Sequence, residues 1–255
     1  MTDTTASAVS AMPRGGPDAS WLDRRLQTDR LEYLDRDDVD ELKQKVVRAL
    51  DRGGRRRHGI YGRCARIVRD EASGLRAPKI LELGAGLGGL SEKLLELHPT
   101  AEVTVTDLDA GFVATIAESA VGRHPRATVR VMDATAIDAP DGAYDLAVFA
   151  LSLHHLPPPL AAQVFAEGTR VARILVIIDL RRPPAPVHAV VLGAVLPFTR
   201  LLPLTHDGVI SSMRAYSPSA LRALARHAHP DIDVEFRTVH IGPTVAVARR
   251  RPAHH

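Results

Sequence analysis

The spacing of hydrophobic residues divides the chain into three parts. Residues 1–20 are rich in Ser, Thr, Ala, Gly and Pro and show no hydrophobic periodicity, which predicts a disordered tail. From residue 21 to 72 the chain is charged, and apolar residues such as Leu42 and Val46 recur at helical spacing. A further helix is expected over residues 60–71. We therefore predict an amino-terminal helical cap over residues 21–72.

The third part, from residue 73 to 255, has a different rhythm. Short runs of aliphatic and β-branched residues alternate there with stretches of helical spacing, such as Leu87, Leu90 and Leu94. This alternation is typical of βαβ units, which build a parallel sheet covered by helices on both faces. We therefore predict one α/β domain with a mostly parallel sheet. The seven predicted strands are 79–83, 103–106, 128–132, 145–151, 174–179, 232–238 and 243–249.

A glycine-rich loop follows the first predicted strand, in the sequence ILELGAGLGGLS at residues 80–91. Gly84, Gly86 and Gly89 satisfy the G-x-G-x-x-G pattern, whose glycines permit a tight turn and close approach to a ligand. NAD-binding loops normally have an apolar residue where this chain has Glu82. A carboxylate there suits a ligand with a cationic amino group, and S-adenosylmethionine has an ammonium group and a sulfonium but no pyrophosphate. The loop therefore favours S-adenosylmethionine over NAD.

The loop and several later stretches resemble the motifs of class I S-adenosylmethionine-dependent methyltransferases. The stretches are ELGAGLG at 82–88, VTVTDLD at 103–109, MDATAID at 132–138, YDLAVFALSLHHL at 144–156 and VARILVIIDLRR at 171–182. The resemblance implies a Rossmann-like fold with a seven-stranded, mostly parallel sheet. It also implies that Asp107 accepts hydrogen bonds from both ribose hydroxyls and that Asp133 and Ala134 contact the adenine. The implied cofactor-binding residues are Glu82, Gly84, Ala85, Gly86, Gly88, Asp107, Leu108, Asp133, Ala134 and Ala150.

The sequence after the fourth strand bears on the methyl acceptor. Methyltransferases that act on base amines or glutamine usually have an Asn/Asp-Pro-Pro-aromatic motif there, whereas residues 150–153 of this chain are Ala-Leu-Ser-Leu. A small-molecule acceptor is therefore favoured. The flanking stretches are LDRDDVDELKQKVVRAL at 34–50 and THDGVISSMRAYSPSALRALA at 205–225. They resemble a branch that acts on polyketide or phenolic, quinone-like natural products. This resemblance implies a lipophilic phenol or enol, with O-methylation favoured and C-methylation open.

Three histidines are candidate catalytic bases. His154 and His155 follow the fourth strand, and His206 precedes Asp207 in a second polar stretch. A neutral histidine can take the proton of a phenol because its pKa lies near working pH. The alternative is that the histidine pair packs or caps a turn, and that His206 belongs to a turn. In the cap, His58 or Tyr61 is expected to line the pocket or else to lie on the surface.

The segment 187–215 is predicted to be an insert or lid. Its first part, 187–204, is almost wholly apolar, but proline interrupts it and it is too short to span a bilayer. It is expected to pack on the cap, to line a pocket for an apolar acceptor, or to contact a membrane surface.

Composition limits the partners and the compartment. The net charge of +3 and the aromatic content of 4% argue against a nucleic-acid partner. Cys64 is the only cysteine, and no signal peptide is recognisable, which favours the cytoplasm. No metal site is predicted, and the oligomeric state stays open. Two alternatives to a methyltransferase remain at this point: a non-catalytic S-adenosylmethionine-binding or interaction protein, and an NAD(P)-dependent oxidoreductase.

Overall fold

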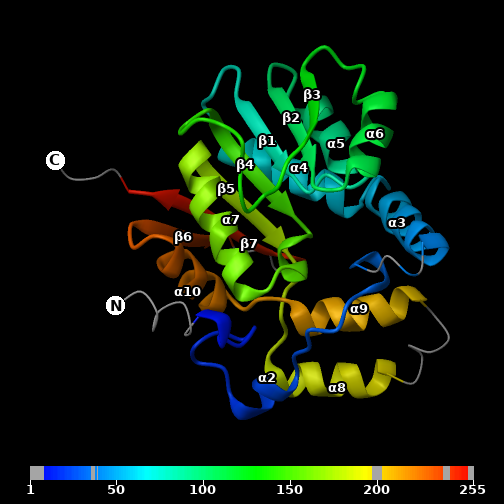
Figure 1. Ribbon diagram of the computed structural model, residues 1–255, viewed down its shortest axis with the longest axis vertical. Coiled ribbons are helices and arrows are strands. Elements are labelled where there is room, and N and C mark those ends of the chain that lie inside the picture. Colours follow the sequence, from blue (N-terminus) through cyan, green and yellow to red (C-terminus); the bar gives the residue numbers. More distant parts are fainter. Residues whose placement is uncertain (1–8, 36–37, 39, 197–202, 238–241, 252–255) are drawn as a thin grey trace.

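A computed structural model describes residues 9–35, 38, 40–196, 203–237 and 242–251 of the 255-residue chain. Seven strands form one sheet in the order β3-β2-β1-β4-β5-β7-β6 (Figure 1). Strand β7 is antiparallel to both of its neighbours, and the other pairings are parallel. The strands are β1 (Lys79–Leu83), β2 (Glu102–Asp107), β3 (Ala127–Val131), β4 (Tyr144–Ala150), β5 (Ala172–Asp179), β6 (Ile232–Arg237) and β7 (Thr244–Arg250). The predicted seven-stranded, mostly parallel α/β fold is confirmed.

Helices cover both faces of this sheet. Alternate residues of each central strand point to opposite faces, so Ile80 and Leu81 of β1 belong to different core clusters. The first cluster packs against α7 (Pro158–Val171) and α10 (Pro218–Ala228). The second packs against α4 (Ile60–Glu71), α5 (Gly89–Leu97) and, through Ile116, α6 (Ala110–Glu118). Two buried cores of this kind hold the carboxyl ends of the parallel strands in a fixed arrangement.

The elements of the predicted helical cap lie in two different parts of the structure. They are α2 (Trp21–Arg25), the 3-10 turn η1 (Tyr33–Asp35), α3 (Asp40–Gly54) and α4. Helix α4 buries Cys64, Ala65 and Val68 against the sheet, so it belongs to the helical layer of the domain. In contrast, η1 packs on the 203–214 helix described below.

The described part of the predicted disordered tail is ordered. Val9 is buried in the first core cluster, with Met12 packed against that cluster. The Arg14 guanidinium is also buried, where it donates hydrogen bonds to the carbonyl oxygens of His154, Leu156 and Arg214. The prediction of disorder is therefore wrong for residues 9–20, because these few buried groups are enough to fix a segment whose composition is otherwise polar. Residues 1–8 lie outside the described residues.

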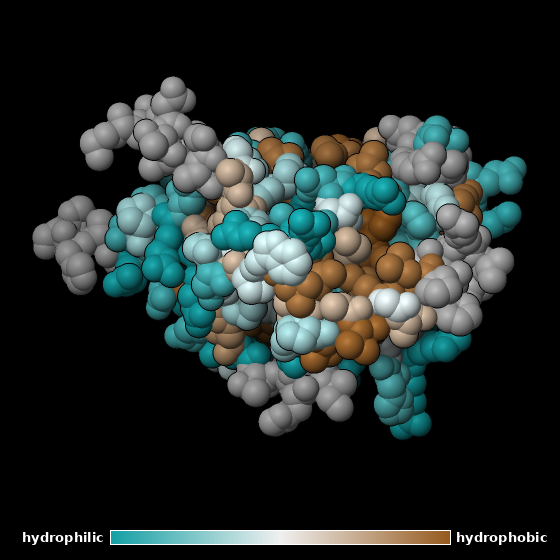
Figure 2. Space-filling model, turned by 90° about the horizontal axis from the view of Figure 1, so that it is seen from below, coloured by the Kyte–Doolittle hydropathy of each residue, from teal (hydrophilic) through white to brown (hydrophobic). Residues whose placement is uncertain are grey.

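Two helices of the predicted lid lie beyond the carboxyl ends of the strands. They are α8 (Ala185–Val195) and α9 (Pro203–Arg214), and Figure 1 shows them below the sheet with α2 beside α8. Helix α8 is apolar, and Val187, Val190 and Val191 are exposed. Figure 2, which views this end of the molecule, shows hydrophobic residues gathered there. Among the described residues, no helix has the length and apolar character needed to cross a membrane.

Candidate active site

The glycine loop turns sharply between β1 and α5. Gly84, Gly86 and Gly88 all have positive φ angles, of 64°, 56° and 74°. A side chain at these positions would be strained, because only glycine adopts this conformation freely. A Cβ added at Gly86 would meet no atom within 4 Å, so the backbone of the loop is open at this residue. The loop therefore offers backbone that a ligand can approach closely.

Glu82 lies beneath this loop as a buried carboxyl group. Ser91 donates a hydrogen bond of 2.6 Å to its Oε2 atom. Burial raises the pKa of Glu82 to about 8, a shift that the Ser91 hydrogen bond opposes and the charge of Asp107 supports. A buried carboxyl group of this kind is ionised more easily when a cation lies beside it. Glu82 therefore fits a ligand with a positively charged group.

Asp107 stands at the end of β2 and faces the glycine loop. Its Oδ2 accepts a hydrogen bond of 2.8 Å from the Gly86 amide, and its Oδ1 accepts one of 2.9 Å from the Asp109 amide. Each carboxylate oxygen can accept a second hydrogen bond. Burial raises the pKa of Asp107, although both amide hydrogen bonds oppose the shift. This oriented carboxylate fits a ligand that offers two hydroxyl donors.

Residues next to the strand ends complete this side of the site. Leu108 follows Asp107 and is exposed, which leaves an apolar surface beside the carboxylate. Asp133 accepts hydrogen bonds of 2.7 Å from both the amide and the hydroxyl of Thr135. The structure thus brings Glu82, the glycine loop and Asp107 together, and it places Asp133 and Ala134 after β3, the strand paired with β2.

The end of β4 touches the glycine loop and links the two sides of the site. A Cβ added at Gly84 would lie 2.9 Å from Phe149 Cε2 and 3.2 Å from Ser152 Oγ. After Ala150 the chain turns through Leu151, which has the unusual φ angle of 58° for a residue other than glycine. The turn leads directly into η2 (Leu153–His155). The predicted cofactor and acceptor residues are therefore neighbours in space.

His154 is held in place by the carboxylate of Asp179 at the end of β5. Its Nδ1 donates a hydrogen bond of 2.7 Å to Asp179 Oδ1, and its amide donates one of 2.8 Å to Oδ2. Both side chains are buried. Burial would raise the pKa of Asp179, but the His154 ring and the amide donors outweigh it, and the pKa is lowered. The hydrogen bond to Asp179 fixes the orientation of the His154 ring, and Nε2 of this ring is not bonded to Asp179.

His155 has a second carboxylate partner, from the amino-terminal segment. Its Nδ1 donates a hydrogen bond of 2.8 Å to Asp35 Oδ1, and Arg214 pairs with the other oxygen of Asp35. Burial opposes ionisation of Asp35, but the contacts with His155 and Arg214 outweigh it and hold its pKa below the usual range. The rings of His154 and His155 lie 4.2 Å apart between centroids.

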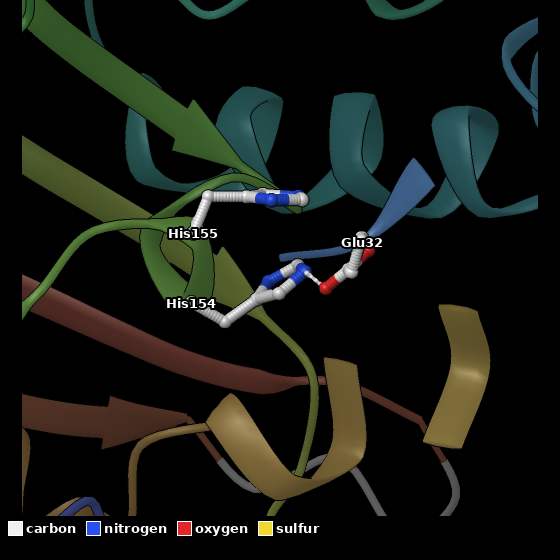
Figure 3. Close-up of side chains that lie close together, drawn as sticks. All are labelled: Glu32, His154 and His155. Carbon is white, nitrogen blue, oxygen red and sulfur yellow. Dashed lines mark ion pairs between the residues drawn. The ribbon is translucent and has the colours of Figure 1, made fainter. Parts of the chain in front are cut away.

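Glu32 reaches the same place from the segment before η1. It is buried, and its Oε1 lies 3.7 Å from Nε2 of His154 and 4.0 Å from an Arg214 guanidinium nitrogen. Figure 3 shows the Glu32 side chain directed at the His154 ring, with the His155 ring beside it. Burial raises the pKa of Glu32 to about 7, although nearby His155 and Ser211 oppose the shift.

The third predicted base, His206, occupies a helix and not the turn considered from the sequence. It lies in α9, where its Nδ1 is 3.0 Å from Asp207 Oδ1 and its ring is 4.6 Å from that of Tyr33. Asp207 Oδ1 also accepts a hydrogen bond from the Tyr33 amide. His206 therefore borders the segment that carries Glu32 but does not contact Glu32, His154 or His155 in the described contacts.

Arg55, in the basic stretch RGGRRRH at residues 52–58, has a structural role. Arg55 donates hydrogen bonds to Asp51, Glu92 and the Leu87 carbonyl oxygen, and so ties α3 to the glycine loop and α5. Tyr61 packs close to Gly89, the first residue of α5, whereas His58 is exposed. Burial raises the pKa of the Tyr61 hydroxyl. Tyr61, and not His58, thus lies beside the cofactor side of the site.

Four residues of this site were not predicted from the sequence: Glu32, Asp35, Asp179 and Arg214. Asp179 had a detectable signal, because it is the polar residue that ends the buried apolar run ILVIID. Glu32 and Asp35 lie in the polar stretch RLEYLD, and nothing local separates them from the other acids there. Their role depends on how the segment folds back over η2.

Comparison with known proteins agrees with this geometry. Residues 80–174 match a family model described as "Methyltransferase domain". The malonyl-[acyl-carrier protein] O-methyltransferase of Geobacter sulfurreducens is 35% identical over 100 residues, covering 39% of this chain and 36% of the relative. The demethylmenaquinone methyltransferase of Thermus thermophilus is 29% identical over 189 residues, covering 66% of this chain and 83% of the relative. The chain thus spans about a third of the first relative and most of the second.

A solved structure extends the likeness in fold to almost the whole chain. The plantazolicin methyltransferase BpumL in complex with SAH superposes with a TM-score of 0.62 over 90% of this chain and 94% of that protein, at 11% identity. The fold, the loop after β1 and the carboxylate after β2 define the Rossmann-like class of these enzymes. Residues 80–174 thus match a methyltransferase domain, and the chain has the fold of solved S-adenosylmethionine-dependent methyltransferases. This likeness supports S-adenosylmethionine, and not a nicotinamide, as the cofactor.

Proposed function

We propose that this protein methylates a small, lipophilic acceptor whose nucleophile carries an acidic proton, such as a phenol or an enol. The observation that carries the proposal is the buried His154–Asp179 pair at the carboxyl ends of β4 and β5, next to the turn that contacts Gly84. Ligands of open α/β sheets bind beyond these strand ends. An acidic oxygen is the preferred nucleophile in this proposal, and an acidic carbon is the alternative.

The cofactor half of the site is proposed to hold S-adenosylmethionine through residues of this chain. Glu82 would face its ammonium group, Asp107 its ribose hydroxyls, and Asp133 with Ala134 its adenine. The cofactor would lie along the backbone of Gly84, Ala85, Gly86 and Gly88. Leu108 and Ala150 would contact its edges. The bound cofactor supplies a methyl group on a positively charged sulfur, which an acceptor displaces from the side opposite the sulfur.

The acceptor half is proposed to remove the acceptor's proton and to exclude water. Proton removal is assigned to the centre formed by His154, His155 and Glu32, because two of these three side chains are fully buried beside the strand ends. His206 borders this centre and is assigned a contact with the acceptor. Enclosing the reacting atoms strengthens their electrostatic interactions and aligns them for displacement.

The apolar end of the molecule supports a lipophilic acceptor. Helix α8 carries exposed valines beyond the strand ends, and Nε2 of its His188 lies 3.2 Å from Oγ of Ser212 in α9. Binding sites for small molecules are mostly apolar with a few placed polar groups. One relative is named for an acceptor of the quinone type, demethylmenaquinone, which is consistent with this choice. A peripheral contact of the same face with a membrane surface remains part of this proposal.

Transfer of labelled methyl groups tests the proposed function. The wild-type protein is incubated with methyl-labelled S-adenosylmethionine and a panel of lipophilic phenols and enols. We expect a labelled product, and we expect His154→Ala to lower turnover by about 10²-fold or more with unchanged cofactor affinity. His227→Ala, an exposed change on α10, is the matched control. Product formation by His154→Ala at the wild-type rate would rule out the proposed role of this histidine.

A further inference from the structure

Two hydrogen-bond acceptor atoms face each other where the methyl acceptor is proposed to bind. The Nδ1 of His154 donates its proton to Asp179, so a neutral His154 ring carries a lone pair on Nε2. Glu32 Oε1 lies 3.7 Å from that nitrogen, too far for a hydrogen bond. This oxygen is buried and has no hydrogen-bond partner. A buried polar atom in this situation is costly unless a cation or a donor lies between the two acceptors.

A carboxylate also orients the second histidine, His155. The Nδ1 of His155 donates to Asp35, which leaves Nε2 of this ring available. One ligand atom each from Glu32, His154 and His155 lies within 4.8 Å of the other two (Figure 3). Histidines that bind metals almost always donate their other ring nitrogen to a carboxylate or a carbonyl oxygen, which fixes the ring and its tautomer. Both histidines here have such a carboxylate.

The charges around Glu32, His154 and His155 also favour the binding of a cation. Glu32 and Asp179 lie next to His154, and Asp35 pairs with His155. In the part of the chain that the structure describes, the ion pairs bring one guanidinium group, that of Arg214, to these carboxylates. With Glu32 ionised, the three carboxylates outnumber this guanidinium, and a divalent ion would offset the difference.

We propose that Glu32, His154 and His155 bind a divalent first-row transition ion of the Zn²⁺ type, with Asp179 and Asp35 orienting the two histidines. Two imidazoles and one carboxylate suit such an ion better than Mg²⁺, which prefers oxygen ligands. Three protein ligands leave a coordination position open for an oxygen of the acceptor. The positive charge of the ion would favour binding of a phenol or enol in its ionised form, after its proton has passed to solvent.

This inference deepens the proposed function, since it assigns the two histidines as ligands and not as bases. Metal binding is nevertheless a property of the resting protein and can be measured without any acceptor. If metal binds but no methyl transfer is found, only the proposed function fails. If methyl transfer occurs in protein that binds no metal at this centre, only the metal site fails, and a histidine base explains proton removal.

The test is metal binding by chelator-treated, full-length protein. Titration with Co²⁺ is followed by visible absorption, and titration with Zn²⁺ by calorimetry. We expect one ion per chain, a Co²⁺ spectrum of mixed nitrogen and oxygen ligation, and a higher melting temperature with Zn²⁺. Glu32→Gln, which retains the shape of the side chain, and His155→Ala should each weaken binding at least about 10-fold, and Asp35→Asn about 10- to 100-fold.

Two controls separate this centre from other histidines. His227→Ala removes an exposed histidine of α10, and a double variant, His254→Ala with His255→Ala, removes those at the end of the chain. Both should bind the ion as the wild-type protein does. The inference is overturned if the wild-type protein shows no Co²⁺ spectrum of this kind, if Glu32→Gln binds as tightly as wild type, or if the double variant abolishes binding.

Discussion

At the scale of the residue, burial gives Glu82 a property that its sequence position alone does not reveal. The carboxyl group is fully enclosed beneath the glycine loop, and its pKa rises to about 8. Without a ligand, burial therefore favours the protonated form of this group. A cation placed beside it reverses this preference, because an opposite charge favours the ionised carboxylate. Cofactor binding and loss of a proton should then occur together.

This linkage gives a prediction about proton release. Near pH 7, S-adenosylmethionine binding to the wild-type protein should release protons, because the pKa of Glu82 falls when the ammonium group arrives. Calorimetry in two buffers with different ionisation enthalpies measures the number released. Glu82→Gln cannot release this proton and should bind with the same heat in both buffers, after correction for dilution. Equal release by this variant and the wild type would assign the proton to another group.

The same group affects the stability of the free protein. Between its ordinary pKa of 4.5 and about 8, the folded protein holds a proton on Glu82 that the unfolded chain has lost. The free energy of unfolding therefore falls as pH rises through this window. Below the window both states are protonated, and the contribution is fully favourable. In urea denaturation at pH 5 and pH 8, Glu82→Gln should lose less stability between the two pH values than wild type.

At the scale of the element, the strands could be predicted from the sequence and the amino-terminal segment could not. A buried parallel strand such as ILVII needs little beyond its own apolar residues to be recognised. The disposition of residues 9–35 depends on partners far along the chain: Val9 enters the core, Arg14 bonds to η2, and Asp35 pairs with His155. No local pattern encodes such contacts, so the sequence indicated a tail and a cap where the structure has a segment that reaches the proposed acceptor site.

Arg14 provides a test of how firmly this segment is fixed. Its guanidinium is buried and donates to three carbonyl oxygens, those of His154, Leu156 and Arg214. Arg14→Ala should lower the free energy of unfolding by ~3 kcal/mol, because hydrogen bonds to charged groups are strong and the carbonyls would lose their donor. Arg24→Ala, which removes an exposed hydrogen bond to the Ala19 carbonyl oxygen, should change it by only about 0.5 kcal/mol.

Urea denaturation of both variants measures these two changes. An Arg14→Ala protein as stable as Arg24→Ala would mean that residues 9–20 contribute little to the folded state. The segment would then be bound loosely at η2.

At the scale of the whole molecule, the two halves of the site meet because adjacent strands end at the same edge of the sheet. Strand β1 delivers the glycine loop, β4 delivers the histidines, and β5 delivers Asp179. The residues of the proposed cofactor half could be named from the sequence, since they lie within a few positions of strand ends and match known motifs. The acceptor half was predictable only in part, because it assembles side chains from segments separated by more than a hundred residues.

Ligand-dependent melting tests the cofactor assignment on the intact protein. A ligand that binds only the folded state adds RT ln(1 + [L]/Kd) to the free energy of unfolding, about 2.7 kcal/mol at a hundredfold excess over Kd. For a domain of this size each kcal/mol raises Tm by roughly 2–4 °C. S-adenosylmethionine and S-adenosylhomocysteine should therefore raise Tm by roughly 5–10 °C at that excess, and NAD should leave it unchanged.

Asp107 makes the melting test specific to the proposed ribose contact. Asp107→Ala should weaken cofactor binding by ~2 kcal/mol or more, since hydrogen bonds to a charged group are lost. At the same ligand concentration, most of the rise in Tm should then disappear. Asp138→Ala, at an exposed carboxylate that pairs with Arg130, should retain the full rise. A full rise with Asp107→Ala would show that another residue holds the ribose, and a rise with NAD alone would contradict the cofactor assignment itself.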